Sequence, residues 1–190
     1  MIDPYVDPAT GVLRNLLGLT ERDLLASAEA DITDALVIRL RLRCLPGGYD
    51  LAHLQAFHRK IFGDIYPWAG EIRTVDIAKG TSFCPVRNIA AYADEVFSRL
   101  KGEGYLWGLP HGTFVDRLAE YYGDVNALHP FREGNGRTQR AFFGQLTRDA
   151  GYRIAWEHLE REANIEASVA SFRGDNGPLR KLLDALVEGR

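Results

Sequence analysis

The sequence predicts a mainly α-helical protein, a helical bundle that carries one β-hairpin. Along most of the chain, apolar residues recur three or four positions apart, as they do on one face of a helix. The stretch after residue 70 changes to a period of two around a short turn, which is typical of a β-hairpin. The sequence contains no internal repeat, low-complexity tract or linker, so we expect a single domain over residues 1–190.

Composition argues against several classes of function. Apolar residues make up 46% and charged residues 26% of the chain, as in ordinary globular proteins. The formal net charge of −3 gives no overall positive field, so direct nucleic-acid binding is not expected. Cys44 and Cys84 form no CxxC pair and suggest neither a disulfide framework nor a zinc site. No leader and no run of ~20 apolar residues is visible, so we expect a cytoplasmic protein without a membrane partner.

The first part of the chain is predicted to form an extended lead-in and two helices. Thr20 is expected to cap the first helix, with Asp23 favoured near its positive end. The stretch VIRLRLRCL that follows fits a strand and a continuing helix equally well, so both remain open. Asp50 is expected to cap the second helix and Gly63 to end it.

Residues 72–85 predict the hairpin, because their polar and apolar residues alternate around the short glycine-containing turn AKGT. Pro85 closes the second arm. The remainder is predicted to be helical. The expected helices run from a cap at Asn88 to about Leu100, from a cap at Thr113 to about Leu128, and near 136–150, 156–172 and 178–188.

The stretch HPFREGNGRTQR, residues 129–140, combines residue types that folding alone does not require. Pro130 should turn the chain and hold His129 at a helix end. The tripeptide GNG at 134–136 directly precedes a helix, where backbone amides can converge on an anion such as a phosphate. A lone histidine in this place is more often a core residue bound to a backbone carbonyl, so the rest of the stretch must decide.

The helix after this loop should have one buried and one basic face. Arg137, Arg140 and Arg148 share the basic face, opposite Phe142 and Phe143. Arg137 and Arg140 lie in the first turn, where positive charge opposes the helix dipole unless an anion binds there. Two arginines beside the GNG tripeptide therefore favour a bound polyphosphate.

An acid and a base complete this predicted polyphosphate site. The carboxylate of Glu133 is the kind of ligand that Mg²⁺ uses beside a polyphosphate, although a salt bridge to an arginine is its commoner role. Histidine can accept the proton of an attacking hydroxyl near neutral pH, which gives His129 the role of the base. Together the residues predict a polyphosphate site, with amides and arginines for the oxygens, Glu133 for a metal ion and His129 for a proton.

The stretch resembles the signature of the Fic family, H-x-F-x-[DE]-G-N-G-R-x-x-R, and each specified position is met. HLQAFHRKIFGDIYPWAGEIR and TVDIAKGTSFCPV are similar to the family's W-A-G-x-x-R segment and to its hairpin, called the flap. DPYVDPATGVLRNLLGLT resembles the lead-in of short bacterial toxin-type members. The resemblance implies a single Fic domain over residues 1–190, with the flap at about 72–85 and the core motif at 129–140.

This resemblance implies a protein adenylyltransferase (AMPylator), which transfers AMP from ATP to a tyrosine, serine or threonine hydroxyl of a target protein. By position, His129 resembles the general base, Phe131 the core anchor and Glu133 the Mg²⁺ ligand. The flap would hold the target by adding a strand to its edge. The implied ATP-binding residues are Gly134, Asn135, Gly136, Arg137 and Arg140, and the target-binding flap residues are Ile77, Lys79, Gly80, Thr81 and Phe83.

The resemblance also bears on the transferred group and on partners. Related Doc-type kinases carry lysine at the position of Gly136, so glycine favours transfer of AMP over transfer of phosphate. Many members contain or bind an inhibitory helix with [ST]-x-x-x-E-[GN], and the nearest strings here, at Ser27 and Ser171, have aspartate for the glutamate. A small antitoxin is therefore implied in trans, with its helix against Arg140, and type II topoisomerase subunits are one target class of toxin-type relatives.

Other functions remain open at this stage. The same pocket could transfer phosphate, UMP or GMP, and a non-enzymatic binding module is a further alternative. His53 and His58 lie five positions apart, on different sides of a helix, and do not suggest a metal site. A nucleic-acid binder would have to use the arginines of VIRLRLRCL, which are Arg39, Arg41 and Arg43.

Overall fold

The structure is a computed structural model, and it describes residues 3–79 and 81–189. The described residues form seven α-helices, which confirms the predicted fold class. The helices are α1 (Arg22–Leu42), α2 (Leu51–Phe62), α3 (Ile89–Gly102), α4 (His111–Leu128), α5 (Asn135–Asp149), α6 (Arg161–Phe172) and α7 (Gly177–Leu186). Short 3-10 turns lie at Val86–Asn88, Gly104–Leu106 and Trp156–His158.

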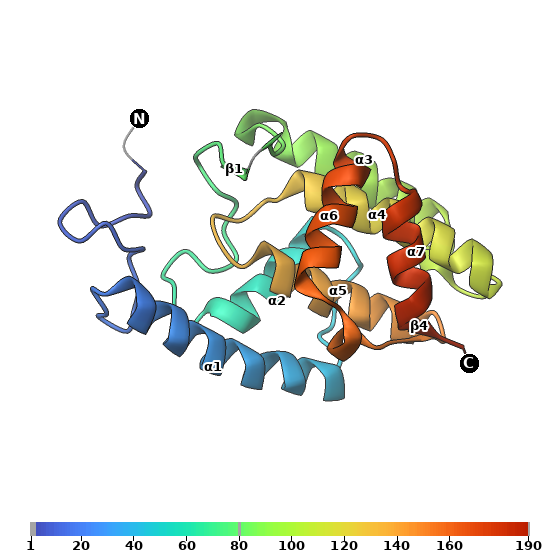
Figure 1. The fold of residues 1–190 in the computed structure, drawn as a ribbon, viewed down its shortest axis with the longest axis horizontal. Coiled ribbons are helices and arrows are strands. Elements are labelled where there is room, and N and C mark those ends of the chain that lie inside the picture. The colour runs from blue at the N-terminus through green and yellow to red at the C-terminus, as the bar shows by residue number, and fades with distance from the viewer. Residues whose placement is uncertain (1–2, 80, 190) are drawn as a thin grey trace.

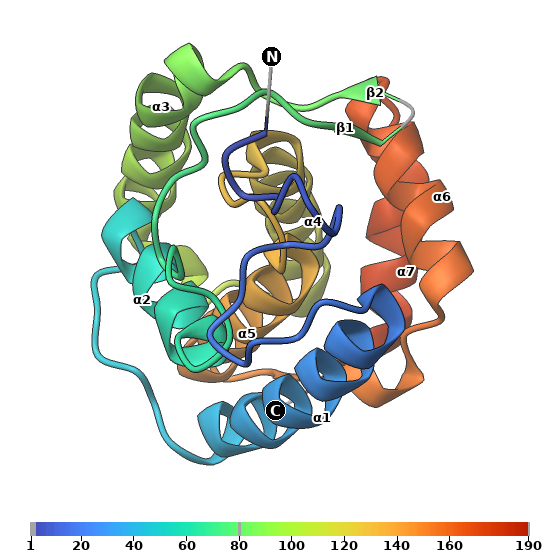
Figure 2. The same cartoon turned by 90° about the vertical axis from the view of Figure 1, so that its left-hand side faces the viewer.

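Helices α4 and α5 form the centre of the bundle, and the other five helices surround them (Figures 1 and 2). Both central helices bury large apolar side chains, such as Phe114, Leu118, Phe142 and Phe143, which are fully enclosed. Burial of each such side chain contributes roughly 1.5–3 kcal/mol. The loop that joins α4 to α5 is therefore held between two helices with large buried side chains.

The predicted hairpin is present but its regular part is short. Strand β1 (Ala78–Lys79) pairs antiparallel with β2 (Thr81–Ser82), with Ala78 opposite Ser82. The hairpin crosses the top of Figure 2. Beyond these strands the arms are extended; the Phe83 amide donates to the Ile77 carbonyl at 3.2 Å across the hairpin, and the Cys84 amide donates to the Ala127 carbonyl of α4 at 3.0 Å. We call residues 72–85 the flap.

A second strand pair joins the C-terminal end of the chain to the segment after α5. Strand β3 (Arg153–Ile154) pairs antiparallel with β4 (Val187–Glu188). This pair was not predicted, because two-residue strands are too short to show an alternating pattern.

Helix α1 settles the ambiguity of VIRLRLRCL in favour of the helix. It runs without a break to Leu42, and Arg43 is extended. Its buried residues, Leu25, Glu29, Thr33 and Leu40, recur at helical spacing, and packing of this stripe outweighs the local alternation. The predicted cap at Thr20 is wrong, since Glu21 occupies that position and its side chain makes no capping bond.

The other predicted helix ends are partly right. Asp50 caps α2 as expected, because its carboxylate accepts a hydrogen bond from the His53 amide at 2.8 Å, and Gly63 ends that helix. Asn88 stands at the start of α3, but its side chain makes no capping bond.

Two predicted helix starts are wrong. Helix α4 begins at His111, after Pro110, so Thr113 lies inside it. Helix α6 begins at Arg161 and not near 156, because Trp156–His158 forms a separate 3-10 turn. No helix in the described ranges is both long and apolar enough to span a bilayer.

Candidate active site

His129 follows α4 directly and has an unusual backbone conformation. Its φ of 43° and ψ of 60° are left-handed, and its amide donates to the Val125 carbonyl at 3.2 Å. A left-handed conformation costs a residue other than glycine about 1–2 kcal/mol. The predicted placement at a helix end is confirmed, and the strain is of the kind found at functional sites.

The imidazole ring of His129 is held on two sides. Nδ1 lies 3.0 Å from the Asn126 carbonyl oxygen, and the Phe83 ring of the flap stacks on the imidazole with centroids 3.7 Å apart and an 11° angle. A carbonyl oxygen only accepts hydrogen bonds, so Nδ1 carries the hydrogen. In the neutral ring Nε2 then holds the lone pair, which is the state that a general base needs.

The loop after His129 is anchored by Phe131 and Asn135. Phe131 is 1% exposed, and its ring stacks on His58 with centroids 4.0 Å apart. The Asn135 side chain accepts from the Phe131 amide at 2.9 Å and donates to the Phe131 carbonyl at 2.8 Å. Asn135 stays predicted to line the nucleotide site, and its side chain in addition holds the loop.

Gly134 and Gly136 differ in the space that surrounds them. Gly134 has a φ of 79°, and a Cβ there would lie 2.3 Å from Cζ of Phe62. Gly136 is exposed, and a Cβ there would lie 3.4 Å from Nη1 of Arg140. Just before α5, Oε1 of Glu133 accepts a hydrogen bond from the Gly134 amide at 3.0 Å. The loop therefore presents a carboxylate and backbone amides at the N-terminus of α5, as predicted.

His58 is a site residue that sequence reasoning considered only as a metal ligand. It is fully buried; its Nδ1 accepts from the Gly70 amide at 2.8 Å, and its Nε2 donates to the Glu133 carbonyl at 2.9 Å. It thus ties the W-A-G segment to the loop. The signal was its place on the apolar side of α2, between Leu54 and Ile61.

The burial of His58 predicts a pH-dependent stability. Burial lowers the pKa of His58 to about 4, from an ordinary value of 6.5. Between these values the unfolded chain binds the proton and the folded chain does not, so stability is lost as the pH falls. Protonation of His58 should lower the free energy of unfolding by on the order of 3 kcal/mol between neutral pH and a pH below the folded pKa.

Urea unfolding between pH 4 and 7 measures this effect. His58→Gln should lose stability at pH 7 and show a weaker decline toward acid than the wild type. His158→Gln, which replaces an exposed histidine, is the control. Parallel pH curves for the wild type and His58→Gln would contradict the assignment.

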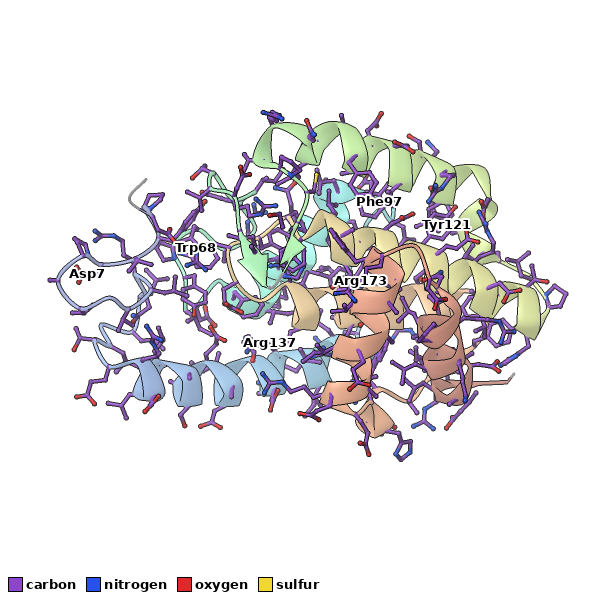
Figure 3. The ribbon with its side chains drawn as sticks, turned by 45° about the horizontal axis from the view of Figure 1, so that its top comes forward. Asp7, Trp68, Phe97, Tyr121, Arg137 and Arg173 are labelled. Atoms are coloured by element: carbon purple, nitrogen blue, oxygen red, sulfur yellow. The ribbon has the colours of Figure 1, made fainter. Side chains whose placement is uncertain are left out.

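Arg137 has a partner in α1 that was not predicted. Its guanidinium forms an ion pair with the buried Glu29, donates to Oγ1 of Thr33 at 2.9 Å, and lies 4.9 Å above the Phe62 ring. The Tyr66 hydroxyl also donates to Glu29. Figure 3 shows Arg137 between α1 and the start of α5.

This contact corrects the expectation that Arg137 lacks a structural reason for its position. The positive charge of Arg137 is unfavourable near the positive end of the α5 dipole, and the negative charge of Glu29 compensates it. The signal in the sequence was an acid within the buried stripe of α1, four residues after Leu25 and four before Thr33. Arg137 therefore links α1 to the start of α5, next to the loop.

Substitution of Glu29 tests this link. Glu29→Gln should destabilise the protein by on the order of 2 kcal/mol, because a charge-assisted bond is lost between side chains that are 11% and 23% exposed. Asp31→Asn, on the exposed side of the same helix, should change the free energy of unfolding by less than about 0.5 kcal/mol. Equal stabilities of the two variants in urea unfolding would refute the link.

Arg140 lies at one end of a groove between α1, α5 and the segment 153–157. The groove encloses about 530 Å³ and is lined on its apolar side by Val37, Leu40 and Trp156. Arg148, also on this face, is used to hold the end of α1, since it donates to the Arg41 carbonyl at 2.7 Å. Arg137, Arg140 and Arg148 all line the groove, and Arg137 and Arg140 lie in the turns of α5 next to the loop.

The flap residues are only partly described. Ile77 accepts from the Phe83 amide at 3.2 Å through its carbonyl, and Phe83 covers His129. Gly80 lies outside the described residues, as do the side chains of Lys79 and Thr81.

The model of the Fic/DOC family matches residues 48–147, which include the flap, the loop and most of α5. The chain belongs to the Fic/DOC family. The assignment agrees with the resemblance seen in the signature of residues 129–140.

Curated Fic relatives are similar over nearly the whole chain. Protein adenylyltransferase VbhT of Bartonella schoenbuchensis is 42% identical over 97% of this chain, which spans 38% of that protein. A protein of Salmonella typhimurium named "Probable protein adenylyltransferase Fic" is 41% identical over 99% of this chain and 94% of its own length. The similarity therefore extends beyond the region matched by the family model.

A solved Fic domain has the same fold. The N-terminal Fic domain of a VirB-translocated Bep effector protein from Bartonella quintana, with bound ADP, has a TM-score of 0.93 and 27% identity. The match covers 98% of this chain and 95% of that one. The Fic domain of that protein thus holds an adenine nucleotide on the same fold.

Proposed function

We propose that this Fic protein is an adenylyltransferase that transfers AMP from ATP to a hydroxyl group of a target protein. The observation that carries the proposal is the position of His129, whose Nδ1 is bonded to a backbone carbonyl, beside the amide loop of α5. The two curated relatives named as adenylyltransferases support it.

The phosphates of ATP bind at the N-terminus of α5. There the backbone amides of the loop and the positive end of the helix dipole face an anion. Arg140, in the first turns of α5, adds a positive charge, and Arg137 is held nearby by Glu29. The ADP bound to the Bartonella quintana Fic domain supports an adenine nucleotide here.

The reaction is a single displacement. Nε2 of His129 accepts the proton of the target hydroxyl, the hydroxyl oxygen attacks the α-phosphorus, and the bond to the leaving pyrophosphate breaks. The product is a phosphodiester between AMP and the target. Catalysis rests on holding the reactants in line and on donors placed before charge develops. The pairing of His129 with Asn126 and Phe83 keeps the base oriented.

Glu133 fits the requirement for a Mg²⁺ ligand. One of its two carboxylate oxygens is bonded to the Gly134 amide, at the point where the phosphates would lie. In the described part of the chain no three His, Cys, Asp or Glu side chains are grouped to hold a metal by themselves. Mg²⁺ commonly binds through one carboxylate and substrate phosphates. Bound with ATP, the cation would neutralise phosphate charge.

Transfer of AMP is favoured over transfer of phosphate by Gly136. A Cβ at this position would lie 3.4 Å from Nη1 of Arg140, so a long side chain, such as the lysine of Doc-type kinases, would extend into the pocket for the outer phosphates. Glycine leaves that space for the leaving pyrophosphate. Phosphate, UMP or GMP transfer is the alternative outcome of the mass measurement described in the Discussion.

The flap is the docking edge for the target. A target segment adds a strand beside β1 or β2, which brings its tyrosine, serine or threonine toward His129. From the resemblance to toxin-type members, type II topoisomerase subunits are the first target class to test. Because ATP is a cytoplasmic nucleotide, we place the reaction in the bacterial cytoplasm.

A small antitoxin occupies the groove beside Arg140. The groove combines the positive charge of Arg140 with the apolar Val37, Leu40 and Trp156, which suits an amphipathic helix that carries a glutamate. Expression of this chain alone should arrest growth, and a neighbouring small protein with the inhibitory motif should relieve the arrest. Normal growth with soluble chain present would contradict the toxin proposal and leave the chemistry intact.

A lysate labelling experiment tests the function. Purified protein is incubated with bacterial lysate, Mg²⁺ and ATP labelled on the α-phosphorus. We expect one or a few labelled proteins, and the same bands should be absent when EDTA removes Mg²⁺. Absence of labelled protein at all protein concentrations would overturn the proposed activity.

A further inference from the structure

Arg73 is a charged side chain at the base of the flap that is almost completely buried, with 1% of its surface exposed. Its Nε donates to the His129 carbonyl at 2.9 Å and its Nη1 to the Val75 carbonyl at 2.8 Å; Nη2 donates to the Cys84 carbonyl. Its own backbone amide donates to the Pro130 carbonyl at 2.9 Å. One side chain thus contacts both flap arms and the segment of the general base.

This arrangement is energetically demanding. Burial lowers the pKa of Arg73, which reflects the cost of removing a guanidinium from water. The nearest acid, Asp76, is 75% exposed and lies 3.7 Å away, so it offers little compensation. Three backbone carbonyls satisfy the cation instead, and the planar guanidinium can reach three directions at once. A flap that served only as a docking edge would not need a buried cation at its base.

The second flap arm contacts the histidine from another side as well. The Phe83 ring stacks on the His129 imidazole, and the next residue, Cys84, accepts from Arg73 and donates to Ala127 of α4. The ring and the backbone of His129 are therefore both bonded or packed against the flap. A displacement of either arm would move the base.

We propose that Arg73 is a positioning residue that couples the flap to His129, so that a target strand docked on the flap meets a base already in place. The proposal rests on the proposed adenylyltransferase function. Arg73 holds the strained left-handed backbone of His129 through its carbonyl and sets the separation of the two flap arms. It acts through His129 and the flap and does not touch the nucleotide.

The nucleotide loop has its own supports, which makes the proposal testable. Asn135 holds Phe131, and His58 holds the Glu133 carbonyl, without any contact to Arg73. Loss of the Arg73 contacts should therefore impair transfer to protein while ATP binding persists. If Arg73 were only structural, its loss would weaken ATP binding and transfer to protein alike, in proportion to the fraction of unfolded protein.

The test compares Arg73→Lys and Arg73→Gln with Arg87→Gln, an exposed arginine just after the flap. Lysine keeps the charge but cannot span three carbonyls. Both Arg73 variants should retain the wild-type affinity for ATP in calorimetry within about threefold. Transfer of α-labelled AMP to the lysate target should fall about 100-fold, the typical effect of a misplacement near 1 Å. Arg87→Gln should match the wild type in both.

A second variant of the flap tests the coupling itself. Phe83→Leu should impair transfer in the wild type, and its additional effect should be clearly smaller in the Arg73→Lys background, because both changes release the same base. Strictly additive losses would overturn the coupling. The proposal would also be overturned if Arg73→Lys transferred AMP as well as the wild type or lost ATP affinity in parallel with transfer. Failure of the Arg73→Lys protein to fold would overturn it as well. If the wild type itself labels no protein, the proposed function fails instead.

Discussion

Replacement of His129 by alanine should reduce AMP transfer by at least about 100-fold and leave ATP binding intact. General bases typically contribute 10²- to 10⁴-fold to a rate. Among the described residues, His129 is the histidine of this loop, and its Nδ1 is bonded to the Asn126 carbonyl, which leaves Nε2 to act as the base. In the proposed site the loop amides and arginines bind ATP, and this change removes none of them. Label transfer in lysate and calorimetry with ATP measure the two quantities.

The backbone of His129 requires a second variant. Alanine is strained at a φ of 43°, so His129→Ala also affects the loop conformation. Asparagine adopts the left-handed region more readily and still cannot act as a base near neutral pH. His129→Asn should therefore show the same loss of transfer with a smaller loss of stability. Transfer by His129→Asn at the wild-type rate would exclude the general-base role.

Gly134→Ala is expected to cause a comparable loss of transfer by disrupting the nucleotide loop. The added Cβ would lie 2.3 Å from Cζ of Phe62, and the alanine backbone would have to adopt a φ of 79°. The conformational term alone is about 1–2 kcal/mol, and the clash forces either the Phe62 ring or the loop to move. A loop displacement near 1 Å should reduce transfer about 100-fold, and ATP affinity should fall with it.

Gly112→Ala is the matched control for this variant. Gly112 lies in α4, and a Cβ at that position would meet no atom within 4 Å. This variant should keep ATP affinity and transfer, and it should gain a little stability because alanine favours helices. If Gly134→Ala bound ATP as tightly as Gly112→Ala, the loop would not be the nucleotide site.

The sequence predicted the part of the site that is contiguous in the chain. The positions of His129, Phe131, Gly134 and Arg140 follow from helix ends, glycine geometry and helical spacing, all of which are local. The structure added one role, since the Asn135 side chain holds the loop through Phe131.

The contacts made across the fold were beyond sequence reasoning. Glu29 and Arg137 are 108 residues apart, and Arg73 reaches His129 across 56 residues. Nothing local indicates such pairs, although a charged residue within an apolar stripe hints that a partner exists. The same reason explains VIRLRLRCL, where packing of α1 decided between two patterns that were equally good locally.

The mass of the modified target is the most direct test of the account. The protein is incubated with ATP, Mg²⁺ and a purified target recovered from the labelled lysate band, and the intact target is weighed. We expect the mass to increase by one AMP unit, with label carried from the α-phosphorus and none from the γ-phosphorus. An increase by one phosphate, with label from the γ-phosphorus, would contradict the adenylyltransferase assignment.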